Sequence, residues 1–322
     1  MSTESEFDRE RMTRHEPVML REVLAFLQCR PGGSYVDGTC GLGGHAQAIL
    51  EASAPDGQLL AIDRDAAALD LCRERLASFG ERVRFAHDNF RNIPLILNNL
   101  ALSDLDGILL DLGVSSMQLE DEARGFSFQR AGLLDMRMDR RQRLTAADLI
   151  NDLEEEGLAD LIYKYGEEPA SRRIARRIVE SRRHSPIRTT TDLAAIVEKA
   201  AGRPAFGRSR RHLATRTFQA LRIAVNDELR DLDLFIEELC AYVGPGGRMV
   251  VISFHSLEDR MIKTAFRRLA GQCVCGLPVA QCRCPRQPRV TILTPRPEIP
   301  QDDEIDGNPR ARSAKLRAAM KL

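Results

Sequence analysis

The sequence lacks a net charge and a long apolar run, and each absence excludes a class of protein. Among its 322 residues, 47 Lys or Arg balance 47 Asp or Glu, which argues against a uniformly basic nucleic-acid-binding protein. No run approaches the roughly eighteen apolar residues of a membrane span, and residues 1–16 are polar without the apolar centre of a secretory signal. With 43% apolar residues the chain suits one or two globular domains, and we expect it in the cytoplasm.

Cysteine is scarce as well. Eight cysteines in a chain of this length are too few and too dispersed for a disulfide framework. Four of them nevertheless cluster, with the spacing Cys-x-Cys-x6-Cys-x-Cys, at Cys273, Cys275, Cys282 and Cys284. Four thiolates suit a tetrahedral zinc ion, although the usual Cys-x2-Cys pairs are replaced by tighter ones. The sequence leaves two interpretations, a zinc site or a loop of reduced, partly exposed thiols.

A glycine-rich turn near the N-terminus organises the rest of the chain. The apolar residues before Asp37 indicate a strand, the glycines from Gly38 to Gly44 a tight turn, and residues 46–51 the start of a helix. Glycine lets bare backbone approach a ligand, and free N–H groups at a helix start favour a carboxylate or phosphate. We therefore predict a nucleotide-like cofactor here. The alternative is a glycine-rich turn with a purely structural role.

An acid after the second apolar run supports the cofactor. Residues 57–63 predict a strand that ends at Asp63, twenty residues after Gly43. A carboxylate at this place can accept hydrogen bonds from both ribose hydroxyls of an adenosine. The alternative for Asp63 is the N-cap of the next helix, a role that Asp65 can also fill.

Strands alternate with helices in the first and last thirds of the chain. Predicted strands lie at 36–37, 59–63, 83–87, 107–111 and 248–253. This spacing predicts an α/β fold, in which helices cover both faces of a parallel sheet. One cofactor-binding half followed by an appended strand at 289–293 suits S-adenosylmethionine better than a nicotinamide cofactor, which would require a second such half.

The middle of the chain has a different pattern. From 120 to 216 no strand-like run occurs, and apolar residues recur at helical spacing with plausible helix starts at Thr145, Ser171 and Thr191. We therefore predict a helical insertion domain at 119–216. It interrupts the α/β domain, whose two parts are 1–118 and 217–322.

Basic residues are concentrated in this insertion. Between residues 170 and 216, thirteen Lys or Arg face three Asp or Glu. They include Arg172, Arg173, Arg176, Arg177, Arg182 and Arg183 on or beside one predicted helix, and Arg208, Arg210 and Arg211 in a later loop. This pattern predicts a surface that contacts nucleic-acid phosphates without base selectivity. The alternative is an ordinary solvated helix face.

Seven short motifs occur along the chain. They are Asp37–His45, Asp106–Gln118, Arg124–Phe128, Leu134–Met138, Thr215–Ala220, Ile252–Arg260 and Asn308–Ser313. In this order they resemble the bacterial 16S ribosomal RNA cytosine-N4 methyltransferase family, and they cover nearly the whole chain. One departure is Cys40, where the family often carries an aromatic residue.

The resemblance implies a Rossmann-like class I S-adenosylmethionine-dependent methyltransferase that modifies the exocyclic N4 of one cytidine in the decoding region of 16S ribosomal RNA. The implied partner is that RNA or the small ribosomal subunit; the oligomeric state is open, with a homodimer as one option. The implied cofactor contacts fall on Gly43, Gly44, His45, Asp63, Phe90, Asp111 and Gln118. Phe90 could equally be a core aromatic, and Gln118 a surface residue.

Methylation of an exocyclic amine requires hydrogen-bond acceptors rather than a covalent nucleophile, because the lone pair of N4 is delocalised into the ring until acceptors hold its N–H groups. Many amino methyltransferases carry Asp or Asn before Pro-Pro-aromatic after the fourth strand, but residues 111–116 read Asp-Leu-Gly-Val-Ser-Ser. The candidate acceptors are Asp111 and the segment 253–256 with His255, although His255 could equally be structural. An aromatic residue such as Phe126, Phe128 or Phe254 would stack on the extruded base.

Overall fold

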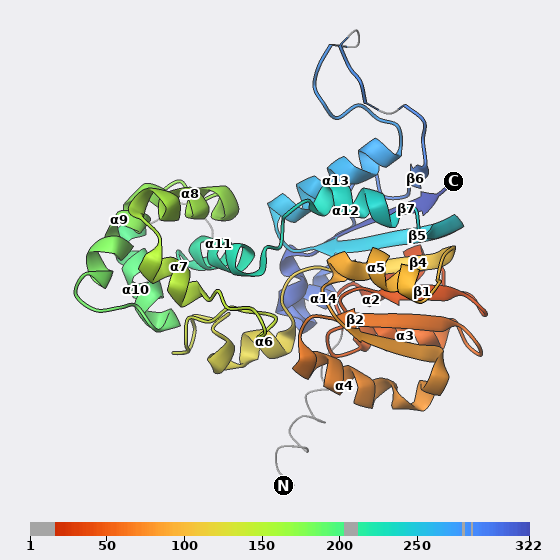
Figure 1. Ribbon diagram of the computed structural model, residues 1–322, viewed down its shortest axis with the longest axis horizontal. Helices are drawn as coiled ribbons and strands as arrows, with labels where there is room; N and C mark the ends of the chain where they lie inside the picture. Colours follow the sequence, from red (N-terminus) through yellow and green to blue (C-terminus); the bar gives the residue numbers. More distant parts are fainter. Residues whose placement is uncertain (1–16, 203–211, 279–280, 285) are drawn as a thin grey trace. The chain divides into compact units, whose positions relative to one another are not determined.

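The computed structural model describes residues 17–202, 212–278, 281–284 and 286–322. The chain forms two compact units. The first unit contains a seven-stranded sheet (Figure 1). The strands are β1 (Ser34–Asp37), β2 (Gln58–Asp63), β3 (Val83–His87), β4 (Leu105–Asp111), β5 (Val243–Ser253), β6 (Val290–Ile292) and β7 (Lys315–Lys321). Their order is β3-β2-β1-β4-β5-β7-β6, with the first five parallel and β7 antiparallel to both neighbours. The order reverses between β1 and β4, and ligands of open α/β sheets bind beside the carboxyl ends of the strands at such a point.

Helices cover both faces of this sheet (Figure 1), so its central strands are apolar along most of their length. Leu59, Leu60, Ala61 and Ile62 of β2, for example, are all buried. The covering helices are α2 (Leu20–Leu27), α3 (Gly44–Ala52), α4 (Ala66–Leu76), α5 (Ile93–Asn99), α12 (Leu232–Leu239), α13 (Ser256–Leu269) and α14 (Asp302–Gly307). The predicted α/β class and its mostly parallel sheet are thus confirmed.

The last strand of the chain, β7, is missing from the prediction. The predicted strand at 289–293 exists as β6, but it pairs with β7, and β7 is the strand that pairs with β5. Charges at Lys315, Arg317 and Lys321 disguise β7 in the sequence. Arg317 is only 5% exposed, and its charge is compensated because Nε donates to Oδ1 of Asp259 at 2.6 Å.

Residues 114–230 form the second compact unit, whose described residues contain helices and connecting segments but no strand beyond the isolated bridge of Leu133 with Thr189. Its helices are α6 (Ser116–Glu120), α7 (Ala146–Asp152), α8 (Glu155–Gly166), α9 (Ser171–Arg182), α10 (Thr190–Ala201) and α11 (Thr215–Asn226). The predicted limits of 119 and 216 differ from these bounds, and 216 falls inside α11. Phe218 and Leu221 of α11 lie in the same apolar core as Ile162 of α8 and Ile174 of α9, which explains why α11 belongs to this unit.

Side-chain caps start three of these helices, α6 at Ser115, α7 and α10. Thr145 is the N-cap of α7, as predicted, and its hydroxyl accepts from the N–H of Asp148. α10 is capped by Thr189 instead of Thr191, and α9 begins at Ser171 without a side-chain cap. Across the described residues, we find no helix whose length and apolar content would let it cross a membrane. The expected N-terminal arm at 1–16 lies outside the described residues.

Candidate functional site

Packing within the protein explains why two positions of the loop between β1 and α3 are glycine. Gly43 has a φ of 81°, and a Cβ there would lie 2.9 Å from Sγ of Cys72 on α4. A Cβ at Gly44 would also meet protein atoms, at 3.2 Å. At Gly41 a Cβ would meet only a carbonyl oxygen, at 4.0 Å, so the loop is open on that side. The cofactor contacts of Gly43 and Gly44 stay predictions.

Asp63 ends β2 and links two backbone segments through its carboxylate. One oxygen accepts from the N–H of Gly41 and the other from the N–H of Asp65, each at 2.8 Å. Asp65 is the N-cap of α4, because its side chain accepts from the N–H of Ala67. Asp63 is therefore not the cap, and each of its oxygens keeps a lone pair for a ligand hydroxyl.

Two further acids lie where the strand order reverses, at the carboxyl ends of β1 and β4. Asp37 is 1% exposed, and its Oδ1 accepts from the N–H of Thr39 at 3.1 Å. The Asp111 side chain is 23% exposed, and its backbone N–H donates to Oγ1 of Thr39 at 2.6 Å. Within the described part of the chain, Oδ2 of Asp37 and Oδ1 of Asp111 are buried without a hydrogen-bond partner. Such oxygens favour a cationic or N–H-donating ligand.

His45 lies beside these acids with its ring buried. Its Nε2 is 2.9 Å from the carbonyl oxygen of Val18, which can only accept, so Nε2 carries the proton. Nδ1 then lies 3.8 Å from Oδ2 of Asp111. The bond to Val18 fixes the ring next to Asp111, and the cofactor contact of His45 stays a prediction.

Burial raises the pKa of all three acids. The pKa of Asp37 rises to about 7, mainly by burial; the N–H of Thr39 opposes the rise and the charge of Asp63 adds to it. Burial, followed by the charges of Asp37 and Glu258, raises the pKa of Asp111 well above its usual range. Burial also raises the pKa of Asp63, despite its two backbone hydrogen bonds. A positive ligand would favour the ionised carboxylates, because opposite charges lower a raised carboxyl pKa.

We expect the ligand-free protein to lose stability as the pH rises from about 4 to about 7. Asp37, with a pKa of about 7 when folded and about 3.9 when unfolded, binds its proton more tightly in the folded state, so the free energy of unfolding falls across that window. The loss is on the order of 2 to 4 kcal/mol and should be absent in Asp37→Asn. In urea titrations, the variant should therefore gain stability relative to wild type between pH 5 and pH 8. An equal difference at both pH values would contradict this assignment.

Phe90 and Gln118 are both held by other parts of the protein. Phe90 is 7% exposed, and its ring centroid lies 5.3 Å from that of Phe235, which fits the core role left open by the sequence. Gln118 is 4% exposed, so it is not a surface residue. It forms a capping box at the start of α6, where its Oε1 accepts from the N–H of Ser115 at 3.1 Å. Cofactor contacts by Phe90 and Gln118 stay predictions.

Two of the three aromatic candidates for base stacking lie in the core of the helical unit. Phe126 is 8% exposed, and the ring of Phe128 lies 4.8 Å from that of Phe218. Phe254, which follows β5, is half-buried. Of the three, Phe254 has the most suitable place, because it follows the carboxyl end of a central strand.

His255 caps helix α13 with a buried ring. Its Nδ1 accepts from the N–H of Glu258 at 3.3 Å, so the proton lies on Nε2, 3.2 Å from Oε1 of Glu258. Glu258 is 2% exposed, and its Oε2 accepts from the N–H of Phe254 at 2.9 Å. The ring of His255 thus caps α13, while Glu258 holds the residue before the cap, and the two bonds order the chain just after β5. His255 therefore has the structural role that the sequence analysis gave as an alternative. A catalytic role of His255 stays a prediction.

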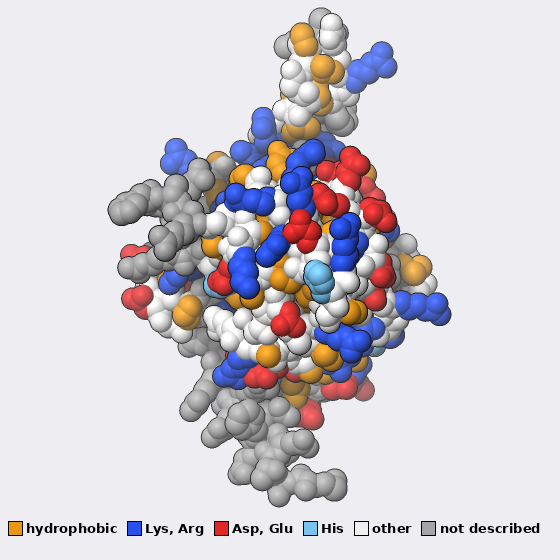
Figure 2. Space-filling model, turned by 90° about the vertical axis from the view of Figure 1, so that its left-hand side faces the viewer, with side chains coloured by type: hydrophobic (Ala, Val, Ile, Leu, Met, Phe, Trp, Pro, Cys, Tyr) orange, Lys and Arg blue, Asp and Glu red, His pale blue; other side chains and the backbone are white. Residues whose placement is uncertain are grey.

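Helix α9 exposes a row of four arginines, namely Arg172, Arg173, Arg176 and Arg177. Two of them form ion pairs: Arg176 Nε lies 3.5 Å from Glu155, and Arg177 Nη1 lies 3.2 Å from Glu180. Figure 2 likewise shows acidic side chains among the basic ones on the face it presents. The basic surface is therefore partly neutralised.

The other predicted arginines differ from this row. Arg182 points inward and donates to the carbonyl oxygens of Ile150 and Leu153 at 2.6 Å each, so its role is structural. Arg183 is exposed. The remaining three, Arg208, Arg210 and Arg211, lie outside the described residues.

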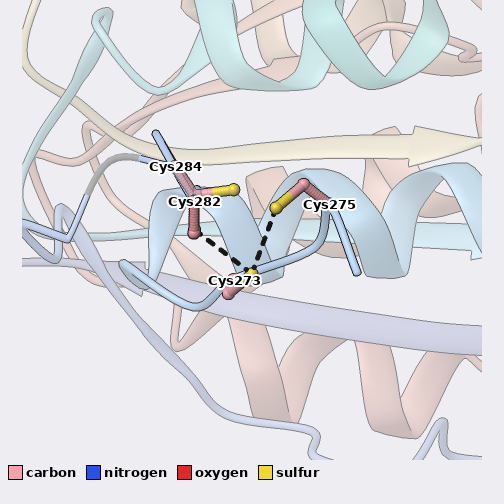
Figure 3. Close-up of side chains that lie close together, drawn as sticks. All are labelled: Cys273, Cys275, Cys282 and Cys284. Carbon is pink, nitrogen blue, oxygen red and sulfur yellow. Dashed lines mark hydrogen bonds between the residues drawn. The ribbon is translucent and has the colours of Figure 1, made fainter. Parts of the chain in front are cut away.

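The four clustered cysteines converge in space as well as in sequence (Figure 3). Their Sγ atoms all lie within 4.8 Å of one another, and Sγ of Cys273 is 3.5 Å from that of Cys275 and that of Cys282. These are separate thiols, since a disulfide bond measures about 2.05 Å. The structure brings together all four residues that the sequence predicted as metal ligands.

Comparison with known proteins decides the family. Residues 12–322 match a family model described as "MraW methylase family". The chain belongs to the MraW methylase family. A protein named ribosomal RNA small subunit methyltransferase H from Geobacter sulfurreducens is 55% identical to this chain over 308 residues, which cover 96% of this chain and 99% of that protein. A protein of the same name from Dehalococcoides mccartyi is 52% identical over 309 residues, which cover 96% of this chain and 86% of that protein. Among solved structures, a SAM-dependent O-methyltransferase from Thermotoga maritima matches with a TM-score of 0.42 and 10% identity, over 98% of this chain and 70% of that one.

As a member of the MraW methylase family, the chain is a methyltransferase, and the family predicted from the seven motifs is confirmed. The methyl donor that the sequence predicts, S-adenosylmethionine, carries a positive sulfonium and a positive ammonium group. The residues at the carboxyl edge of the sheet fit this donor. Asp63 offers acceptors for hydroxyl groups, and the unpaired oxygens of Asp37 and Asp111 suit positive charge.

Three residues of this methylase site were missed from the sequence, although all three lie in the motifs. Asp37 follows a buried strand just as Asp63 and Asp111 do, so the same rule would have found it. Thr39 joins the first loop to the end of β4 through its hydroxyl. Glu258 lies three residues after His255, the spacing of a capping box, and that spacing was the available signal.

Proposed function

We propose that the protein transfers a methyl group from S-adenosylmethionine to the exocyclic N4 of one cytidine in the decoding region of 16S ribosomal RNA, in the cytoplasm. The names of relatives at 52% and 55% identity support ribosomal RNA as the substrate class. The observation that carries the chemistry is the buried, unpaired Oδ1 of Asp111 at the carboxyl end of β4. An amine substrate offers the N–H donor that such an oxygen requires.

The donor contacts follow the order of the strands. Asp63 at the end of β2 is proposed to accept from the ribose hydroxyls, and Phe90 after β3 to border the adenine. Asp37 and Asp111 place negative charge beside the methionine part. Gly43, Gly44, His45 and Gln118 complete the proposed contacts. When bound, S-adenosylmethionine supplies an electrophilic methyl group on a positively charged sulfur.

Asp111 is proposed as the catalytic acceptor for an N–H of the target amine. Its side chain is 23% exposed and can reach a substrate, whereas Asp37 is 1% exposed and acts through its charge. The positive charge of the donor favours ionised Asp111, and the carboxylate localises the lone pair of N4 and stabilises the charge that develops there. The raised pKa then lets Asp111 take the proton that the amine releases. His255 is proposed as a positioning residue that orders the end of β5.

The helical unit, 114–230, is proposed as an RNA-contacting domain. Reversing Arg172, Arg173, Arg176 and Arg177 to Glu should weaken binding of small-subunit RNA. It should also lower the slope of log K against log salt by up to about 3, because each lost phosphate contact removes about 0.7 to 0.9. Binding of S-adenosylmethionine, measured by calorimetry, should not change. An unchanged salt slope in filter binding would assign this face to solvent.

The alternative is a methyltransferase of another nucleic acid. A transfer assay with methyl-labelled donor separates the two functions, using small subunits, free 16S RNA, transfer RNA and duplex DNA as substrates. We expect label in 16S RNA, free or in the subunit. Label only in transfer RNA or DNA would favour this alternative.

A single zinc ion on Cys273, Cys275, Cys282 and Cys284 is also part of the proposal. These cysteines lie between α13 and β6, on a different segment from the acids at the strand ends. We therefore assign the ion no step in methyl transfer.

A further inference from the structure

The segment between α13 and β6, residues 271–289, contains neither helix nor strand among its described residues, and we call it the cysteine arm. Figure 1 shows it extending away from the sheet. At its base, the N–H of Arg289 donates to the carbonyl oxygen of Leu269 at 2.7 Å, and Nη2 of Arg267 to that of Cys273 at 3.2 Å. Leu277 is 52% exposed, so the described residues of the arm build no apolar core. Another interaction must hold the arm in shape.

The four sulfurs have the spacing of ligands around one ion. Around a tetrahedral Zn²⁺ with bonds of about 2.3 Å, two ligand sulfurs lie about 3.8 Å apart. The two measured separations of 3.5 Å and the 4.8 Å limit for all pairs bracket this value (Figure 3). Cys273 and Cys275 come from the outgoing half of the arm, and Cys282 and Cys284 from the returning half. One ion would therefore tie the two halves together.

The chain segment that contains the arm carries charge of one sign, although Arg268 before the arm pairs with Asp233 and Glu237 of α12. Residues 260–297 contain eight Lys or Arg and no Asp or Glu, in a chain whose net charge is zero. Arg283, Arg286 and Arg289 of this stretch lie in the arm and are exposed. Even with the two negative charges of a zinc tetrathiolate, the stretch keeps an excess of positive charge. Such a surface complements a polyanion.

We propose that one Zn²⁺ on the four cysteines folds the arm, and that the folded arm is a second RNA-contacting surface, which holds phosphates through Arg283, Arg286 and Arg289. The inference rests on the proposed function for its choice of RNA. The free energy of metal binding contributes to the local folding of the arm. The described part of the arm has no apolar core, so the ion would hold the segment that carries the three guanidinium groups. With four thiolates the ion has no open position and is structural. The phosphate contacts orient the RNA without reading its sequence.

The metal is tested on the full chain, purified under reducing conditions without chelator. Elemental analysis should find about one zinc per chain in wild type and less than about a tenth in Cys282→Ser/Cys284→Ser. Less than a tenth of an equivalent in wild type, or iron in place of zinc, would overturn the inference.

The RNA contact is tested by filter binding of small-subunit RNA between low and moderate salt. Arg283→Gln/Arg286→Gln/Arg289→Gln should keep its zinc, bind at least about tenfold more weakly and lose about 2 from the salt slope. The zinc-free cysteine variant should lose affinity to a similar extent. A matched control with three exposed arginines elsewhere in the same unit, Arg21→Gln/Arg73→Gln/Arg84→Gln, should resemble wild type.

The outcomes separate the inference from the proposed function. Calorimetry should give an unchanged affinity for S-adenosylmethionine in every variant. If wild type binds and methylates the RNA but the arm variants bind like the control, the inference alone is wrong. If wild type fails to bind small-subunit RNA, the proposed function fails and the inference with it.

Discussion

Replacing Asp111 with Asn is expected to lower kcat/KM for methyl transfer by about 10²- to 10³-fold. Asn keeps the size of the side chain but removes the negative charge. We propose that this charge accepts the N–H of the target amine and stabilises the positive charge that develops on the amine. The raised pKa of Asp111 and its unpaired, buried Oδ1 indicate that the charge is not already compensated within the described residues. The rate is measured as label transferred to small-subunit RNA at varied RNA concentration.

The same strand offers a matched control. Asp106 lies near the start of β4, where it pairs with Arg30 at the surface, and Asp111 lies at its end. Asp106→Asn makes the same chemical change and should keep nearly the wild-type rate. Asp111→Asn should unfold at no lower temperature than wild type, because burial already disfavours the charged carboxylate and Oδ1 has no hydrogen-bond partner to lose. A variant at Asp111 with activity close to wild type would exclude this residue from the reaction.

The second large effect is expected on cofactor binding. Asp63→Ala should weaken the binding of S-adenosylmethionine by about 1 to 3 kcal/mol, or roughly 5- to 150-fold, because the ribose hydroxyls lose their acceptors. The N–H groups of Gly41 and Asp65 also lose their partner, so the loop should loosen. Isothermal titration calorimetry measures the affinity directly.

Asp65→Ala is the control for this variant. Asp65 caps α4, so its loss should cost about 1 kcal/mol of stability but leave the cofactor affinity near wild type. A wild-type affinity in Asp63→Ala would limit Asp63 to its bonds with the backbone. A comparable loss of cofactor affinity in both variants would show that the affinity depends on the order of the loop and not on hydrogen bonds to the carboxylate of Asp63.

The central parallel strands were predictable from sequence because they are buried on both faces and read as continuous apolar runs. β2 and β4 show this most clearly. β7 was not predictable in this way. Arg317 lies in its buried stretch, and only the contact with Asp259, 58 residues earlier in sequence, makes that placement favourable. A periodicity argument does not see such a partner.

The site shows the same division between local and tertiary information. Acids at strand ends can be found from sequence: Asp63 was found in this way, and Asp111 through the family resemblance. The bond of His45 to Val18 and the ring contact of Phe90 with Phe235 join segments that only the fold brings together. The inward turn of Arg182 is likewise invisible in a basic run. The cysteines were predictable because close spacing along the chain already limits their separation in space.

The identity of the methylated nucleoside tests the central claim most directly. Small subunits that lack the modification are incubated with S-adenosylmethionine and the wild-type protein, and their RNA is digested to nucleosides for mass spectrometry against standards for each methylated cytidine. The account predicts N4-methylcytidine, on one decoding-region fragment, in the wild-type reaction and almost none with Asp111→Asn. A methyl group on C5, on a ribose or on another base, or an unchanged nucleoside profile, would contradict it.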